Sequence, residues 1–149
     1  MLDLAREDKN RREYPEVSYS VIGAIVNGLM GIEIEQGEPG AALQESSYVE
    51  GVVATTSRLT SQTEWAEVDQ VPVRNNDIRL RQDGLRKSTL WNVSGPSLIW
   101  KACFIGSVIT ILVDGKGFLA NRAEQHGQSL SCASIPVGSG DVRTAQAVK

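Results

Sequence analysis

The chain has 149 residues, of which 41% are hydrophobic and 22% are charged, and its formal net charge is −3. This length suits one domain with a sizeable core, and the apolar content argues against disorder along the whole chain. The negative charge argues against a nucleic-acid partner. The apolar run 21–34 is too short to cross a bilayer, so we expect no membrane insertion.

The N-terminal segment 1–16, MLDLAREDKNRREYPE, is dense in charges of both signs. It carries acids where a signal peptide needs a basic start and an apolar stretch, so we expect no secretory leader. Helix-forming residues dominate up to Asn10, and Pro15 stands near the end of the segment. We predict a short helical or extended arm, followed by one domain over residues 17–149.

Residues 17–73 show the pattern of strands separated by turns. In GIEIE, Ile32 and Ile34 alternate with Glu33 and Glu35, which predicts a strand with one apolar and one acidic face. GEPG at 37–40 predicts a turn. SYVEGVVATTSRLTS is rich in Val and Thr, and TEWAEVDQVPV alternates imperfectly around acids, so both favour strands.

The segment 75–94 predicts a β-hairpin. In NNDIRLRQDG, Ile78 and Leu80 alternate with two arginines. Asp83-Gly84 is a favoured signal for a two-residue hairpin turn, and TLWNV predicts the returning strand.

The segment 95–113 carries the longest apolar run. SLIWKACFIG predicts a strand, and we predict that Trp100 and Phe104 are buried on one of its faces, together with Leu98 and Ala102. The opposite face, around Lys101, is also mostly apolar, and SVITILVDG is apolar on both faces. We therefore expect both sides to be covered. The cover could be the run 21–34 or, as we favour, a neighbouring subunit.

The C-terminal part predicts a polar loop and a last strand. NRAEQHGQS has the composition of a loop, and SLSCASIPVGSGDV that of a strand in which Pro136 marks an edge or a bulge. The chain has about seven to nine such strands, turn signals at short intervals and no convincing interior helix. This pattern is typical of an antiparallel β-sandwich or jelly roll.

The cysteines Cys103 and Cys132 stand in no CxxC or Cys/His arrangement. We favour free, buried thiols, with a disulfide as the alternative. A structural zinc site needs about four Cys or His ligands, and His126 is the only histidine. We therefore expect no metal and no cofactor.

Candidate catalytic groups are few. His126 lies in the predicted polar loop, which favours an exposed side chain over a general base. Glu33 and Glu35 share a predicted strand face and could act as the paired carboxylates of a glycosidase, but such pairs are more often a solvated face. We expect that the protein is not an enzyme.

Charge is unevenly distributed along the chain. Residues 33–50 contain five acids and no base, namely Glu33, Glu35, Glu38, Glu45 and Glu50. Residues 74–87 contain five bases against two aspartates, namely Arg74, Arg79, Arg81, Arg86 and Lys87. Two solvated faces are the simplest interpretation, and a phosphate-binding patch is the weakest. The sharper hypothesis is an interface between the arginine face of one subunit and the acidic face 33–50 of the next, with Glu33 and Glu35 as candidate residues. It would form in a cyclic homo-oligomer, with a trimer favoured.

Two further features bear on binding. Trp65, Trp91 and Trp100 all lie in strand-like contexts, which favours core positions. The sequon at Asn92 is interpreted as chance. Loops carry function in sandwiches, so the segments 36–47, 114–128 and 137–141 are candidates for a site.

Three stretches follow one another in residues 85–149: LWNVSGPSLIWKACF, ITILVDGKGF and SLSCASIPVGSGDV. In turn chemistry and strand order this segment resembles the β-sandwich tip domains of bacteriophage tail-fibre and collar proteins. The resemblance implies a trimer that binds host surface glycans or proteins. It carries over no functional residue, because these domains share no fixed binding motif.

These observations together predict a non-enzymatic structural or adhesion module of a virion, such as a fibre tip, collar or decoration protein. Its partners would be copies of itself, other virion proteins or a host surface glycan that acts as receptor. A carbohydrate-binding module or lectin, extracellular or at the cell surface, is the alternative. A small β-sandwich enzyme that uses paired carboxylates is third.

Overall fold

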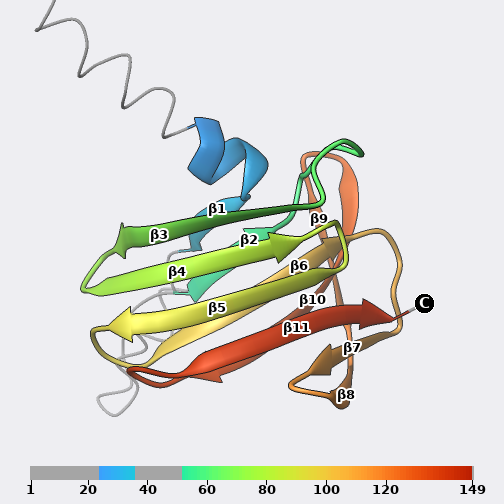
Figure 1. Cartoon of the computed structure of the whole chain (residues 1–149). Helices are drawn as coiled ribbons and strands as arrows, with labels where there is room; N and C mark the ends of the chain where they lie inside the picture. The colour runs from blue at the N-terminus through green and yellow to red at the C-terminus, as the bar shows by residue number, and fades with distance from the viewer. Residues whose placement is uncertain (1–23, 36–51, 149) are drawn as a thin grey trace, which may run out of the picture.

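Two β-sheets packed face to face form most of the described part of the protein (Figure 1). The computed structural model describes residues 24–35 and 52–148. The arm 1–16, the loop 36–47 and the acids Glu38, Glu45 and Glu50 lie outside the described residues. The predicted all-β sandwich is confirmed, and the described ranges contain eleven strands, more than the sequence predicts. No helix in these ranges is long and apolar enough to cross a membrane.

One sheet has six strands, and every neighbouring pair in it is antiparallel. In spatial order these strands are β3 (Trp65–Val73), β4 (Asn76–Asp83), β5 (Lys87–Ser94), β11 (Val142–Val148), β7 (Thr110–Val113) and β8 (Lys116–Leu119). The two outermost strands of this sheet are therefore β3 and β8.

The other sheet has five strands, with β2 and β6 parallel and the other pairs antiparallel. In spatial order these are β1 (Ile32–Glu35), β2 (Val52–Thr56), β6 (Leu98–Ile105), β10 (Gln128–Val137) and β9 (Asn121–Gln125). A short π-helix, η1 (Ala24–Leu29), precedes β1, where the sequence pattern predicts no helix.

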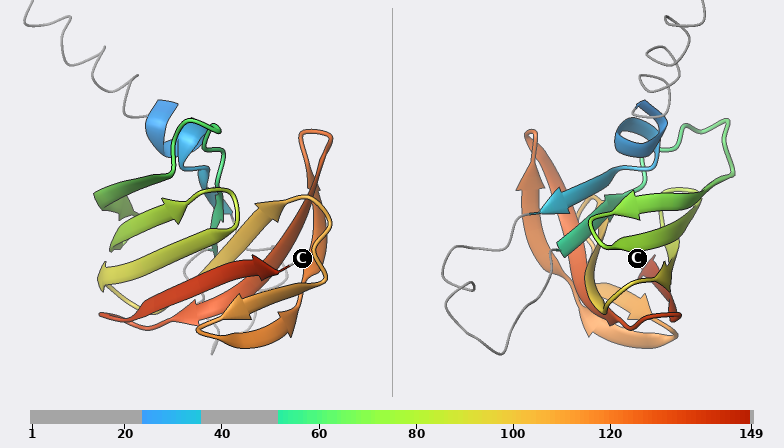
Figure 2. Two further views of the ribbon diagram at one scale, coloured as in Figure 1. Left: turned by 45° about the vertical axis from the view of Figure 1, so that its right-hand side comes forward. Right: turned by 90° about the vertical axis from the view of Figure 1, so that its left-hand side faces the viewer.

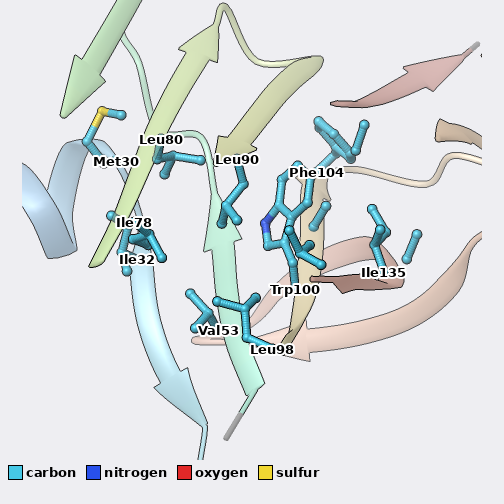
Figure 3. Packing of buried hydrophobic residues seen from close by; sticks show 14 of the residues in the cluster. Met30, Ile32, Val53, Ile78, Leu80, Leu90, Leu98, Trp100, Phe104 and Ile135 are labelled. Carbon is cyan, nitrogen blue, oxygen red and sulfur yellow. The ribbon is translucent and has the colours of Figure 1, made fainter. Parts of the chain in front are cut away.

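The core lies between the two sheets and is centred on β6 (Figure 3). Trp100 and Phe104 are both fully buried on the inner face of β6, as predicted. The indole nitrogen of Trp100 donates a hydrogen bond of 2.8 Å to Oγ1 of Thr55 on β2, so its one polar atom is satisfied. Ile78 and Leu80 of β4 pack against this face from the opposite sheet.

The predicted hairpin between β4 and β5 is confirmed, but its loop is Gly84–Arg86, three residues instead of two. Gly84 has a φ of 61°, which suits glycine, and its N–H bonds to the Glu64 carbonyl at 2.8 Å. This bond continues the register of β3 and β4 by one residue pair beyond Trp65 and Asp83.

The turn between β7 and β8 consists of Asp114 and Gly115, which both have positive φ values, as in a type I′ hairpin. Asp114 ties this turn to β11 by accepting from the Arg143 guanidinium and from the Thr144 N–H, each at 2.9 Å. Burial alone would raise the pKa of Asp114, but these hydrogen bonds and the Arg143 charge hold that pKa below its ordinary value.

The segment NRAEQHGQS is not a loop, which corrects the sequence prediction. Asn121–Gln125 forms β9, and His126 and Gly127 form a tight turn into β10 with φ values of 51° and 73°. Because β9 is an edge strand with mostly exposed or half-exposed side chains, it lacks the apolar alternation by which strands are detected. His126 is exposed, in agreement with the prediction.

The motif NVSGP closes the turn between β5 and β6. Asn92 is fully buried, and its Nδ2 donates to the carbonyls of Pro96 at 2.9 Å and Val137 at 3.3 Å. Nδ2 of Asn76 donates to Oδ1 of Asn92 at 2.9 Å. Gly95 passes so close to the chain that a Cβ there would meet the Asn75 carbonyl at 2.4 Å. The motif is thus structural, and a buried Asn92 is no acceptor for a glycan in the folded protein.

Pro136 lies at an edge, as predicted. β9 pairs with β10 only over Gln128–Cys132, so the rest of β10 has no neighbour on that side among the described strands. The bond from the Gly106 N–H to the Ser129 carbonyl shows that the backbone N–H and C=O groups of odd-numbered residues in β10 point toward β6. The nitrogen of Pro136 therefore faces away from β6, where no ladder bond is lost.

Cys103 and Cys132 form a disulfide, which corrects the preference for free thiols. The antiparallel register of β6 and β10 places these residues directly opposite each other, with a Cα–Cα distance of 4.1 Å. This is the close spacing of a non-hydrogen-bonded pair. Cysteine spacing along the sequence cannot show which two strands become neighbours.

Candidate binding face

The predicted acidic face lies on the outer side of the five-stranded sheet. Nζ of Lys101 on β6 lies 3.1 Å from Oε1 of Glu35, and Nε2 of Gln125 on β9 donates to Glu33. Because β1 and β9 are the opposite edges of this sheet, the contact between Gln125 and Glu33 requires strong curvature (Figure 2). The two edges thereby approach each other over the outer face of β6.

This curvature explains how the second apolar face of β6 is covered. Cys103, Leu130 and Cys132 form a second small cluster of buried residues on the outer side, with Ile105 and Ala123 beside it. The sequence predicts that the run 21–34 or a neighbouring subunit covers this face. The edge strands of the sheet contribute cover, and one of them, β1, contains residues 32–34 of that run, although its Ile32 packs into the main core. Cover by a neighbouring subunit stays a prediction.

Glu33 and Glu35 share one strand face, as the glycosidase alternative requires. The hollow beside them has a volume of about 100 Å³ and is also lined by Lys101 and Gln125. Ligand pockets usually have volumes of roughly 300–1,000 Å³. Within residues 24–35 and 52–148, no group of three or more His, Cys, Asp or Glu side chains could hold a metal ion.

The outer face of the six-stranded sheet presents a more distinctive arrangement. Strand β4 points Ile78 and Leu80 into the core, so Arg79 and Arg81 point outward, as the alternation predicts. The register sets Arg81 opposite Glu67 of β3, and Arg79 opposite Trp91 of β5.

Each of these arginines lies over a tryptophan ring. The guanidinium carbon of Arg81 is 4.4 Å from the ring centroid of Trp65, and that of Arg79 is 5.1 Å from the ring of Trp91. Both distances are within the range of cation–π contacts. We call this set of five residues the tryptophan–arginine face: Trp65, Glu67, Arg79, Arg81 and Trp91.

Glu67 connects the two arginines. Its Oε1 accepts from Nε of Arg79 at 2.8 Å, and its Oε2 lies 3.8 Å from Nη1 of Arg81. Arg81 also donates from Nε to Asp83 at 3.0 Å. The hydrogen bond with Glu67 and the Glu67 charge raise the pKa of Arg79. Both guanidinium groups are therefore held in place by neighbours on their own sheet.

The prediction that all three tryptophans are core residues is wrong for Trp65. Its side chain is 53% exposed, Trp91 is half-buried, and only Trp100 is fully buried. Trp65 pairs with Asp83, which also faces outward, and a β-bulge between Val68 and Val71 shifts the alternation later in β3. This bulge explains why TEWAEVDQVPV alternates imperfectly.

The predicted interface residues occupy three places. Arg79 and Arg81 lie in the tryptophan–arginine face, and Glu33 and Glu35 lie on the other sheet. The remaining bases are exposed in or beside the turns at the two ends of β4: Arg74, Arg86 and Lys87. The chain does not bring the arginines and these two glutamates together, and their pairing between subunits stays a prediction.

Two features of the surface were missed at the level of sequence. Trp65 could have been recognised from its strand partner Asp83, but only once the register of β3 and β4 is known. The edge strand β8 ends at the exposed Leu119, the half-buried Ala120 follows it, and nothing in KGFL distinguishes the strand from a turn. Of the candidate loops, 114–128 is mostly strand, and 137–141 is the turn before β11.

The chain matches no protein-family model, and it has no significant similarity to a curated protein or to a solved structure.

Proposed function

We propose that this protein is a non-enzymatic structural and adhesion module of a virion, that it works as a homo-oligomer, and that it binds its partner through the tryptophan–arginine face. The observation that carries the proposal is the half-exposed ring of Trp65, held in place beneath the guanidinium of Arg81. A large aromatic ring that is exposed at the surface and held in position by its neighbours is well suited to bind a partner.

The chemistry of this face favours binding. Tryptophan and arginine are the residue types most enriched among those that dominate binding energy at interfaces. The contacts of Arg79 and Arg81 with Glu67 restrict their rotamers before a partner arrives. Less conformational entropy is then lost on binding, which favours affinity.

Two arguments support a location on a virion. In turn chemistry and strand order, the sequence of residues 85–149 resembles fibre and collar tip domains, which bind host surface glycans or proteins. The disulfide between Cys103 and Cys132 is typical of proteins that work in oxidising surroundings, and virion surfaces are among these.

A carbohydrate-binding module is the second candidate, and the exposed Trp65 favours it as well. Sugar rings stack on flat aromatic side chains, and the Arg81, Asp83 and Glu67 side chains beside the ring offer charged hydrogen-bonding groups. Both candidates use the same face. They differ in whether the protein must assemble with itself.

A glycan array probed with labelled protein, together with the mass in solution, tests both candidates. We compare the parent with Trp65→Ala, and with Leu85→Ala as a control. Leu85 is 48% exposed and lies in the loop between β4 and β5. We expect glycan binding to fall about tenfold or more in Trp65→Ala and to stay unchanged in Leu85→Ala, as for a contact residue whose loss costs over 1.4 kcal/mol.

The mass separates the two candidates. An oligomer that loses binding with Trp65→Ala supports the adhesion module, and a monomer that does so supports the carbohydrate-binding module. A monomer that binds no glycan contradicts both.

A further inference from the structure

Among the described strands, β8 is an exposed edge whose outward backbone groups pair with no other strand. It forms the outer margin of the six-stranded sheet, beyond β7 (Figure 1), and all four of its residues are exposed. The Ala120 N–H bonds to the Ile109 carbonyl. The backbone N–H and C=O groups of the even-numbered residues in 116–120 therefore point toward β7. The N–H and C=O groups of Gly117 and Leu119 therefore point away from the sheet.

The residues around this edge are apolar to an unusual degree for a surface. Leu119 is 80% exposed, Ile109 beside it 75%, and Phe118 51%. Phe118 pairs with the core residue Ile111, so its ring lies on the inner side of the sheet. There it lines a hollow of about 240 Å³ together with Val113, Ala133, Ile135 and Pro136.

The other free edges among the described strands carry features that hinder pairing with a second chain. β3 has a bulge and Pro72, β1 has two glutamates, β9 has Arg122 and Glu124, and the free half of β10 has Pro136. Bulges, charges, proline and a very short strand are the usual means of protecting an edge. β8 has four residues and one charge, Lys116, at the end next to its turn, and it has no proline or bulge.

We propose that β8 pairs antiparallel with β8 of a second copy of this chain, about a two-fold axis at Phe118. This inference deepens the proposed homo-oligomer by naming its contact. In this register Gly117 lies opposite Leu119 of the second copy, and Leu119 opposite its Gly117. Each of these two pairs exchanges two backbone hydrogen bonds, which uses all the free groups of the strand.

The side chains fit the same register. Phe118 meets Phe118 of the second copy at a non-hydrogen-bonded position, where side chains come closest and aromatic pairs are favourable. Both rings lie on the inner side, beside the apolar hollow. The edge is thus complementary to itself, as a two-fold contact between identical chains requires.

The pairing gives one sheet continuous through both copies. Because the two-fold axis is perpendicular to this sheet, both outer faces point to the same side. The dimer therefore presents two copies of the tryptophan–arginine face in one direction. A trimer is not built by this contact, so the mass in solution tests it directly.

The first experiment measures the mass of the parent and of four variants by light scattering during gel filtration. We expect a dimer for the parent and a monomer for Phe118→Glu, in which like charges oppose each other at the axis. We also expect a monomer for Leu119→Lys, because its two lysines lie at diagonal positions beside the axis and lysine protects an edge strand from pairing. Leu85→Lys adds the same charge away from β8 and should remain dimeric. Mixing Phe118→Glu with Phe118→Lys should restore the dimer, which shows that both variants fold.

The second experiment tests the register with cysteines. The two native cysteines already bond to each other, so an added cysteine is the one free thiol. Phe118→Cys should cross-link two copies on mild oxidation, since non-hydrogen-bonded pairs suit a disulfide, as Cys103 and Cys132 illustrate. Leu119→Cys, which faces Gly117 of the second copy, should cross-link far less.

A parent dimer or trimer whose mass is unchanged by Leu119→Lys and Phe118→Glu would overturn the β8 contact and leave the homo-oligomer standing. A monomeric parent would overturn both. Loss of glycan binding in Trp65→Ala is independent of either result and tests the face alone.

Discussion

The three tryptophans show how one residue type takes different roles according to its strand partner. Trp100 lies on the central strand β6, faces the opposite sheet and has its indole N–H satisfied by Thr55. Trp65 lies on the edge strand β3, opposite the outward-facing Asp83, with one arginine against its ring. The first therefore contributes to the free energy of folding, and the second is available to a partner.

Replacing Trp100 by alanine should lower the free energy of unfolding by about 3–5 kcal/mol, because it leaves a large cavity and an unpaired Thr55 hydroxyl in the core. Trp65→Ala should lower it by less than about 1.5 kcal/mol, since the ring is half in water. Urea denaturation followed by circular dichroism measures both. Equal losses for the two variants would contradict a core role for Trp100 and a surface role for Trp65.

At the level of elements, alternation along the sequence predicts a strand where one face is buried and the other is wet. It identifies β4 and β5, and the two buried aromatic residues of β6 follow from the same rule. It fails for β9, where neither face is apolar. It also predicts a core position for Trp65 that is wrong, because the bulge between Val68 and Val71 interrupts the two-residue alternation of β3.

The candidate site was less predictable than the fold, for a physical reason. The alternation in β4 predicts that Arg79 and Arg81 point outward. It does not predict that they lie over tryptophan rings, because these rings come from β3 and β5. Which side chains meet across strands depends on register, and register depends on turn lengths that the sequence does not fix. The disulfide was misjudged in the same way, since only the pairing of β6 with β10 brings its cysteines together.

The disulfide between β6 and β10 should stabilise the five-stranded sheet. It links residues that are 29 positions apart, which corresponds to about 3–4 kcal/mol in the chain-entropy account. Cys103→Ala combined with Cys132→Ala should lower the free energy of unfolding by that amount. The parent unfolded in the presence of a reductant should show the same loss, and the double variant should not respond to the reductant. A parent insensitive to reductant would argue against a structural role.

For the whole molecule, the position of the edge strand β8 relative to the tryptophan–arginine face decides how a dimer could bind its ligands. The tryptophan–arginine face lies on β3, β4 and β5, and the edge β8 is at the far end of the same sheet. A copy added at β8 covers none of the face. In the proposed dimer the two Trp65 residues would lie about 50 Å apart, from eleven strand spacings of roughly 4.8 Å each. Two such faces can reach neighbouring ligands on one surface.

The dimer should therefore bind a densely coated surface more tightly than its monomeric variant Leu119→Lys, with no difference on a sparse one. Two linked sites turn the second binding event into an intramolecular one, which can raise the apparent affinity by about 10²–10⁴-fold. Surface plasmon resonance on chips that carry an array-positive glycan at high and low density measures this. Leu85→Lys should behave as the parent at both densities. If Leu119→Lys dissociates from the dense chip as slowly as the parent, the two faces do not act together.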